Sequence, residues 1–385
     1  MNKCYSSRTK LLQRTLDEHD ISVAVIADPD SVAYFGGYWN YLGVEFGRPT
    51  LLVIPRDREP ILLTPLMESE MCARMTWIGD IRPWSDGGDE WRLPLAEILT
   101  QWPSSSVGIE TRIMPSLVAT YVKTRVQSSD LVDIAPLISA QRMIKSTDEI
   151  SIMRQAGEVA AAMMDAARQT IAVGVPEYEI TLAAMVAGTR KAAEYLREPD
   201  DRFVSPIIQN IQILQSGTDT CMVHRRTSTR RLERGDPVYL CFCGMVSFRG
   251  YKLGFDREFY VEDARDDQIA VHQVAIAAQR AALAAIRPGV RCEEINAAAE
   301  AVYLDAGYSP GYRTGRSIGL SLLEAPEIKR GERMELRAGM TFAVDGGLTV
   351  PGQFGGRIGD SIVVTDDGFD YLTQYPSEIG ILKSR

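Results

Sequence analysis

The sequence "LRAGMTFAVDGG", residues 336–347, is followed after a short gap by "GGRIGDSIVVT", residues 355–365. Each contains a run rich in β-branched or aromatic residues, "MTFAVDGG" and "SIVVT", and such runs predict strands. Asp345 stands inside the first run. A carboxylate in an apolar strand needs a partner. That partner is either a cationic substrate or Arg316. If it is Arg316, this arginine either only pairs with Asp345 or also binds substrate.

Before these strands in the sequence, the spacing of apolar residues predicts helices in pairs. Two are expected at residues 266–286 and 292–306, and strands are expected at "PVYLCFCG" and "REFYV". A long helix begins after a capping box at residues 146–149 and stops before Gly174 and Pro176, and a second helix follows. Paired helices around a long antiparallel sheet describe an α+β domain.

The N-terminal part of the chain has a different texture. A helix is expected near residues 10–19, followed by the buried strand "ISVAVIADP", and the same alternation of helix and strand repeats to about residue 140. A chain of 385 residues is long enough for two domains. We therefore expect an α/β domain over residues 1–140 and a second domain over residues 141–385.

Composition excludes several functional classes. Hydrophobic residues make up 45% and the net charge is −9, so we expect a globular protein that does not bind nucleic acid. No apolar run is long enough to span a membrane, and the cytoplasm is the expected location. The basic run between Arg225 and Arg234 is interpreted as a loop that forms ion pairs or binds a small anion. The scattered cysteines, including Cys241 and Cys243, are interpreted as reduced core thiols.

Several motifs occur together and in order. They are "IKSTDEISIMRQAG", "GVPEYEI", "RPGV", "GRSIGLSLLEAP" and the two final strands. From about residue 137 to the end, the chain resembles the C-terminal domain of the pita-bread family, which includes methionine aminopeptidase, Xaa-Pro peptidases and creatinase. The resemblance implies a C-terminal pita-bread fold. It also implies an N-terminal α/β domain of the ribonuclease-H-like type, as prolidases and creatinases have.

Peptidases of that family bind two divalent metals through two Asp, one His and two Glu. The resemblance places these ligands at five positions of this chain, of which only the fourth keeps a carboxylate: Phe242, Gly254, Arg316, Asp345 and Gly359. Phe and Gly offer no donor atom, and Arg carries a charge that repels cations. We therefore expect no metal and no other cofactor.

Creatinase is the branch of the family that works without metal. The stretch "YWNYLGVEFGRPTLLVIP" is similar to a creatinase segment that reaches the active site, which implies that Phe46 and Arg48 bind substrate, in the neighbouring subunit of a homodimer. "GYKLGFDREF" resembles the creatinase stretch that carries a catalytic Glu, here Asp256. His224, in "SGTDTCMVHRR", matches the family's active-site histidine, and an imidazole can move protons near neutral pH.

Alternatives remain for the other site residues. Asp256 could instead be an ion-pair partner of Arg257. Lys252 stands where creatinase has a Tyr near its substrate, and it is expected to bind substrate together with Arg316 and Phe242. Both carboxylates are Asp where creatinase has Glu, so a substrate bulkier than creatine is expected.

These observations predict a metal-independent, creatinase-like hydrolase. It would cleave a carbon–nitrogen bond other than a peptide bond in a small zwitterionic guanidino or amidine carboxylate. His224 would be the general acid and base, with Asp256 and Asp345 holding the cationic centre. The alternatives are opening of a cyclic amidine as in ectoine hydrolase, a lyase, and a pseudoenzyme that binds a ligand or a protein.

Overall fold

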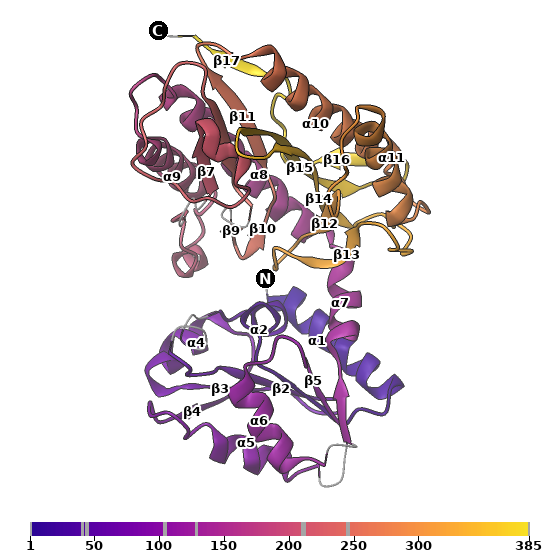
Figure 1. Ribbon diagram of the computed structural model, residues 1–385. Helices are drawn as coiled ribbons and strands as arrows, with labels where there is room; N and C mark the ends of the chain where they lie inside the picture. The colour runs from indigo at the N-terminus through magenta and orange to yellow at the C-terminus, as the bar shows by residue number, and fades with distance from the viewer. Residues whose placement is uncertain are drawn as a thin grey trace. The chain divides into compact units, whose positions relative to one another are not determined.

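The computed structural model describes residues 2–39, 42, 46–102, 106–127, 130–208, 213–243 and 247–383 (Figure 1). The chain divides into two compact units, Met1–Arg142 and Met143–Arg385, and each is treated by itself below. Among the described residues, no helix is both long enough and apolar enough to cross a lipid bilayer.

Unit 1 is built on a mixed sheet. Its described residues form six strands in the order β4-β3-β2-β1-β5-β6. The strands are β1 (Val23–Ile26), β2 (Leu51–Pro55), β3 (Ile61–Pro65), β4 (Asp80–Trp84), β5 (Val107–Ile109) and β6 (Leu131–Asp133). Strand β1 runs antiparallel to β2 and parallel to β5.

Helices cover the sheet of unit 1. They are α1 (Asn2–Glu18), α2 (Pro29–Gly36), α4 (Ser69–Met75), α5 (Arg92–Leu99), α6 (Ser116–Arg125) and α7 (Ala135–Met143). The central strands β1 and β2 are buried at every position, as their continuous apolar sequence predicts. The edge strands β4 and β6 were not predicted, because polar residues interrupt them and only pairing with a neighbouring strand makes them extended.

Unit 2 contains the larger sheet. Its described strands form one nine-stranded sheet with the order β13-β12-β14-β15-β11-β8-β7, to which β16 and β17 add. The strands are β7 (Ile213–Ser216), β8 (Pro237–Cys241), β11 (Asp256–Val261), β12 (Gly315–Ser317), β13 (Glu324–Ile328), β14 (Thr341–Val350), β15 (Phe354–Val364), β16 (Phe369–Tyr371) and β17 (Gly380–Leu382). A separate hairpin joins β9 (Ser247–Phe248) to β10 (Tyr251–Lys252).

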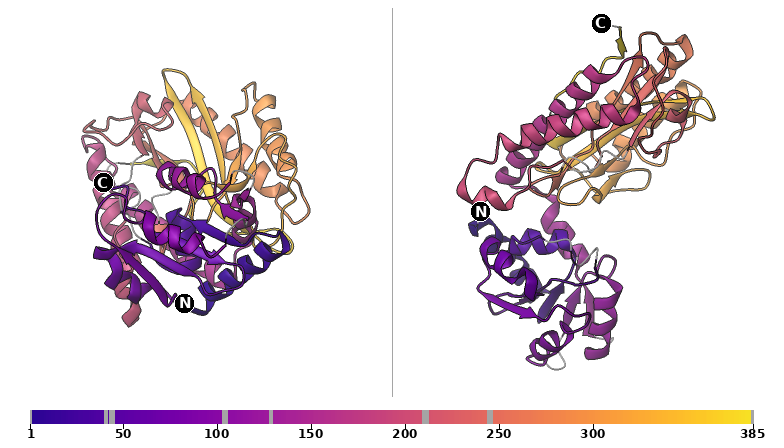
Figure 2. Two further views of the ribbon diagram at one scale, coloured as in Figure 1. Left: turned by 90° about the horizontal axis from the view of Figure 1, so that it is seen from below. Right: turned by 90° about the vertical axis from the view of Figure 1, so that its left-hand side faces the viewer.

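Two helix pairs complete unit 2. Helices α8 (Thr147–Thr170) and α9 (Glu177–Ala193) lie side by side, and α10 (Asp266–Ala285) pairs with α11 (Cys292–Asp305) (Figure 2). The predicted capping box at the start of α8 is present: Glu149 N donates to Ser146 Oγ at 3.3 Å, and Ser146 N donates to Glu149 Oε2 at 2.8 Å. Paired helices on an antiparallel sheet confirm the predicted α+β class.

Glycines let α10 approach the sheet closely. A Cβ on Gly346 of β14 would lie 2.1 Å from the carbonyl oxygen of Ala275, and one on Gly356 of β15 would lie 2.8 Å from Cα of His272. Adjacent residues of a strand face opposite sides. Asp345 therefore lies on the face of the sheet turned away from α10, and Gly359, its partner on β15, lies there too.

Candidate active site

An ion pair between neighbouring strands forms one wall of the candidate site. Arg316 of β12 donates from Nη1 to Oδ2 of Asp345 on β14 at 2.7 Å. Burial by itself would lower the pKa of Arg316, but the adjacent carboxylate of Asp345 raises it above its ordinary value. Of the two partners considered for Asp345, the structure therefore shows Arg316. Oδ1 of Asp345 is buried and accepts no hydrogen bond from any described residue.

Two glycines face this pair. A Cβ on Gly254 would lie 3.0 Å from Nη2 of Arg316, and a Cβ on Gly359 would lie 2.8 Å from Oδ1 of Asp345. The Cβ on Gly359 would also lie 2.9 Å from Oδ2 of Asp256. The carboxylates of Asp345 and Asp256 therefore pack so closely against Gly359 that this position has no room for a side chain.

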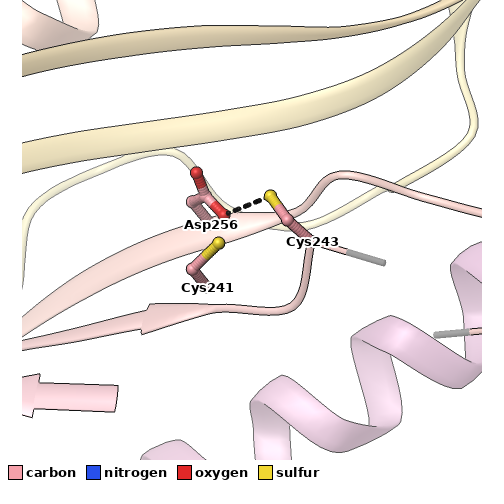
Figure 3. A group of neighbouring side chains, drawn as sticks. All are labelled: Cys241, Cys243 and Asp256. Carbon is pink, nitrogen blue, oxygen red and sulfur yellow. Dashed lines mark hydrogen bonds between the residues drawn. The ribbon is translucent and has the colours of Figure 1, made fainter. Parts of the chain in front are cut away.

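Asp256 is the buried acid of the site. On β11 it pairs with Cys241 of β8 and with Gly359 of β15. Its Oδ2 accepts a hydrogen bond from the Tyr239 hydroxyl at 3.0 Å, and its Oδ1 accepts one from the Cys243 thiol at 3.3 Å (Figure 3). Burial, and then the charge of Asp345, raise the pKa of Asp256 above its ordinary value.

The alternative reading of Asp256 as an ion-pair partner of Arg257 does not hold. The Arg257 guanidinium instead donates to Oδ1 of Asp360 at 2.8 Å, and it reaches Asp256 only at the backbone carbonyl. Adjacent strand positions point to opposite faces, as the sequence argument required. The carboxylate of Asp256 is therefore turned toward the site.

Cys241 and Cys243 belong to this site. From the sequence alone they are interpreted as reduced core thiols. All six cysteines of the chain lie among its described residues and are free thiols. Cys241 is buried and Cys243 is partly exposed, and both sulfur atoms point toward Asp256 (Figure 3). A hydrogen bond with Cys243 and burial raise the pKa of Cys241 well above its ordinary value. The alternation of the C-x-C pair is that of a buried strand, and the sequence alone does not show that this strand pairs with the one that carries Asp256.

Phe242, expected to bind substrate, instead packs in the core. Its ring lies 6.0 Å from that of Phe255, which in turn lies 5.7 Å from the ring of Tyr375. Because Phe242 stands between two cysteines that both face Asp256, its side chain points to the other side of the sheet. The residues of this segment that reach the site are Cys241 and Cys243, one position to either side of Phe242.

Lys252 lies on β10 beside the loop that follows β12. Its backbone N donates to the Gly319 carbonyl at 2.7 Å, and its Nζ donates to the Leu320 carbonyl. The structure thus gives Lys252 a contact with this loop, and no described contact joins it to Asp256 or Asp345.

His224 lies on an exposed turn after the 3-10 helix η4 (Gly217–Cys221). Within the described part of the chain it makes no hydrogen bond or ion pair, including to Asp256, Asp345 or Arg316. The next residue, Arg225, is firmly held by ion pairs with the fully buried Glu177 and with Asp219. The turn that carries His224 is therefore anchored.

Phe46 and Arg48 lie in unit 1. The Phe46 side chain is 63% exposed, and Nη1 of Arg48 lies 3.8 Å from Sδ of Met67. Their binding of substrate stays a prediction.

The residues present do not fit the two-metal centre implied by the fold family. The guanidinium of Arg316 occupies the space toward Gly254, where two metal ligands would be needed, and Gly254 and Gly359 supply no donor. A different set, Cys241, Cys243 and Asp256, has ligand atoms within 4.8 Å of one another. Thiols are soft ligands, unlike the oxygen and imidazole set of the two-metal centre.

Comparisons with known proteins agree with this fold. The sequence profile of metallopeptidase family M24 matches residues 151–366, and that of the creatinase/prolidase N-terminal domain matches residues 8–144. The structure of dipeptidase PepE from Mycobacterium ulcerans superposes with a TM-score of 0.83 at 26% identity, covering 99% of this chain and 98% of that chain. The predicted pita-bread fold with an added N-terminal domain is thereby confirmed.

Two relatives match along nearly their whole length. Agropine synthesis cyclase from Rhizobium rhizogenes is 29% identical over 400 residues, which cover 97% of this chain and 96% of the relative. An Xaa-Pro dipeptidase from Lactobacillus delbrueckii subsp. lactis is 26% identical over 379 residues, which cover 96% and 98%.

These relatives correct one expectation. The sequence analysis predicted a hydrolase acting on carbon–nitrogen bonds other than peptide bonds. The relatives named as Xaa-Pro dipeptidase, and the dipeptidase of known structure, are peptidases, and this contradicts that prediction. The error came from carrying creatinase's reaction over along with its motifs, because motif likeness fixes the fold more firmly than the bond that is cleaved.

Proposed function

Because this chain belongs to metallopeptidase family M24 but carries an arginine in place of a metal ligand, we propose that it is a metal-independent ring-closing enzyme. It would join a carboxyl group to a hydroxyl group of the same small molecule. Ring closure is suggested by the name of agropine synthesis cyclase, with which this chain shares 29% identity. The two groups that are joined are inferred from the contacts of Arg316 and Asp345. Agropine and its open-chain precursor are therefore the first compounds to test.

The observation that carries the proposal is the Arg316–Asp345 pair. A guanidinium 2.7 Å from Asp345 supplies fixed positive charge where the metallopeptidases place cations. Such a group can bind a carboxylate, or the oxyanion that forms when its carbon is attacked, without a metal ion. Arg316 is 6% exposed, so water screens this charge poorly.

Asp345 favours a hydroxyl over an amine as the attacking group. Its Oδ1 is a buried acceptor with no partner among the described residues. A carboxylate holds an amine in its protonated form, which has no free electron pair for attack. A hydroxyl that donates to the same oxygen keeps its lone pairs available.

Asp256 is the proton carrier in this proposal. Burial and the charge of Asp345 raise its pKa, and a carboxyl group with a raised pKa is a stronger base that can both accept and return a proton. His224 is retained as a second proton carrier. The anchoring of Arg225 supports this assignment, since a fixed turn holds the adjacent imidazole in a limited volume.

The test is to treat the full-length protein with a chelator and incubate it with agropine and, separately, with the open-chain precursor. Mass spectrometry follows the loss or gain of one water. The Arg316→Gln variant serves as the inactive control, and the metal content is measured on the same sample. Interconversion that survives chelation and is lost in the variant supports the proposal.

Xaa-Pro dipeptides with and without added Mn²⁺ form the second arm of the test. Cleavage that depends on added metal would overturn the proposal in favour of a dipeptidase. Absence of turnover in both arms, together with saturable binding of either compound, would identify a binding protein that has kept the fold.

A further inference from the structure

We infer that Cys243 is the nucleophile of this site and carries the substrate's acyl group as a thioester. The inference rests on the proposed function, because it names the atom that activates the carboxyl group for ring closure. The sequence analysis assigned this residue no catalytic role. It follows from two contacts of one partly exposed sulfur atom.

The first contact joins the nucleophile to a base. The Cys243 thiol donates to Oδ1 of Asp256 at 3.3 Å, and Oδ2 of the same carboxylate accepts from the Tyr239 hydroxyl at 3.0 Å. A nucleophile, a base and a third group that orients the base form the arrangement on which covalent catalysis depends. Tyr239 is a positioning residue here, because its hydroxyl holds the carboxylate and does not reach the sulfur.

The second contact supplies positive charge. Arg316 interacts electrostatically with Cys243, and both residues border the empty side-chain position of Gly254, with Nη2 at 3.0 Å and Sγ at 3.6 Å from it. The guanidinium of Arg316 lies where the oxyanion of an attacked acyl group can be held.

Exposure separates the two neighbouring thiols. Cys243 is partly exposed, whereas Cys241 is 4% exposed. Of the two sulfur atoms beside Asp256, the one that a substrate can reach from solvent is therefore that of Cys243. We therefore assign the covalent step to Cys243 alone.

In the first step, the sulfur attacks the carboxyl carbon and an S–C bond forms. The thiol proton passes to Asp256 and from there to the departing hydroxyl, so the C–OH bond breaks and water leaves. Arg316 stabilises the negative charge on the remaining oxygen. The product is a thioester on Cys243.

In the second step, the substrate's own hydroxyl, held at Oδ1 of Asp345, attacks the thioester carbon. An O–C bond forms and the S–C bond breaks. The hydroxyl proton passes through Asp256 to the sulfur, which restores the thiol. The sum is an intramolecular ester and one water, with no oxidant, reductant or further reactant.

Acyl transfer to the protein is tested with two probes. One is the open-chain precursor of agropine, quenched in acid within a turnover. The other is p-nitrophenyl acetate, which needs no knowledge of the natural substrate. Intact mass and peptide mapping locate the adduct, and release by hydroxylamine identifies a thioester. We expect one adduct per chain on Cys243 with each probe.

Variants make the assignment specific. Cys243→Ala should lose the adduct and at least ~10³-fold of turnover, whereas Cys4→Ser, which changes a partly exposed thiol of unit 1, should behave as wild type. Asp256→Asn should still fold and should acylate ~10²-fold or more slowly. Circular dichroism and thermal unfolding confirm that each variant is folded.

The outcomes separate this inference from the proposed function. Ring closure at the wild-type rate in folded Cys243→Ala would overturn the inference and leave the function standing. Acylation of Cys243 by p-nitrophenyl acetate, without any conversion of agropine compounds, would support the assignment of Cys243 as nucleophile. It would overturn the proposal that agropine compounds are the substrates. An adduct on another residue, or a bound metal ion that protects Cys243 from acylation, would overturn the inference.

Discussion

Nη1 of Arg316 lies 2.7 Å from Oδ2 of Asp345, while Oδ1 of the same carboxylate is buried and accepts no hydrogen bond from the described residues. One oxygen is thus neutralised by the protein and the other is left for a ligand. Burying an unsatisfied polar atom costs about 1–3 kcal/mol. The cost is consistent with a site in which substrate completes the hydrogen bonding.

The first prediction concerns the charge of Arg316. Arg316→Gln should lower kcat/KM at least ~10²-fold, because a neutral amide stabilises an oxyanion less well. It should also lower the free energy of unfolding by ~1–3 kcal/mol, less than a fully buried pair loses, since the Asp345 side chain is 29% exposed. Steady-state kinetics and urea unfolding measure the two effects.

Arg313→Gln is the matched control for this prediction. Arg313 lies near Arg316 in the chain, but its partner is Glu327, and its side chain is 28% exposed whereas that of Arg316 is 7% exposed. We expect wild-type turnover and a loss of less than ~1 kcal/mol. Equal kinetic losses in the two variants would mean that general destabilisation, and not the charge of Arg316, explains the effect.

The second prediction is a pH profile that Asp256 controls. Burial and Asp345 raise the pKa of Asp256, and the ionisable groups around it also include Tyr239, Cys241, Cys243 and Arg316. The carboxylate must be ionised to accept a proton, so kcat/KM should rise with pH through this raised pKa.

Asp256→Asn should remove that rise and lower activity by ~10²–10⁴-fold. The stability effect has the opposite sign. A raised pKa stabilises the fold at low pH, and this contribution is lost as pH rises through the folded-state pKa. Asp256→Asn should therefore be at least as stable as wild type at pH values above the folded-state pKa of Asp256. If kcat/KM of Asp256→Asn still rises with pH as in wild type, the group that titrates is not Asp256.

The sequence predicted much of this site because the relevant residues lie in ordered motifs. Asp256, Arg316 and Asp345 converge as the family resemblance implied, and Gly254 and Gly359 face them. Phe242 was misplaced by one residue, because motif spacing did not reveal which side of the sheet each residue faces. A strand alternates sides at every position, so an error of one residue moves a side chain from the site into the core.

The role of the thiols could not be predicted from sequence. Cys243 lies beside Asp256 because β8 pairs with β11 in the register that sets Cys241 opposite Asp256. That register depends on residues far apart in the sequence. The short strands β12 and β13 were missed for a similar reason. Strand β12 becomes extended through pairing with β14, and β13 through pairing with β12, which their local sequence does not encode.

The third prediction concerns Glu258, a buried acid near the site. Burial raises its pKa from 4.5 to about 8. Its stabilising contribution is present below pH 4.5 and is lost as pH rises through about 8. At ~1.4 kcal/mol per pKa unit, the loss amounts to a few kcal/mol.

Glu258→Gln should therefore unfold with a smaller pH dependence than wild type over this range, and should be the more stable protein at the alkaline end. Urea unfolding at a series of pH values measures this. If the two proteins show parallel stability curves, Glu258 titrates at an ordinary pKa.

The fourth prediction tests the packing of α10 on the sheet. Gly346→Ala would place a Cβ 2.1 Å from the Ala275 carbonyl oxygen, so the helix must move. Overpacking of this kind costs ~1–3 kcal/mol. Gly311→Ala, with nothing within 4 Å of the new Cβ, should unfold like wild type. Thermal unfolding compares the two variants. Equal unfolding midpoints would mean that α10 can move away from the sheet without a loss of stability.

The fifth prediction decides whether His224 takes part in the reaction. Its turn is exposed, and no described contact links it to Asp256, yet the neighbouring Arg225 is fixed by Glu177 and Asp219. If the imidazole carries a proton, His224→Ala should lower kcat by ~10²-fold or more with little change in stability, while KM changes less.

Arg225→Gln separates position from chemistry, because it frees the turn and keeps the imidazole. It should lower kcat less than His224→Ala does, and the rate that remains should retain the pH dependence of wild type. His19→Ala, which removes another exposed histidine, should leave kcat unchanged. Wild-type kcat in His224→Ala would restrict the chemistry to Cys243, Asp256, Arg316 and Asp345, because an exposed imidazole that carries no proton adds nothing to ring closure.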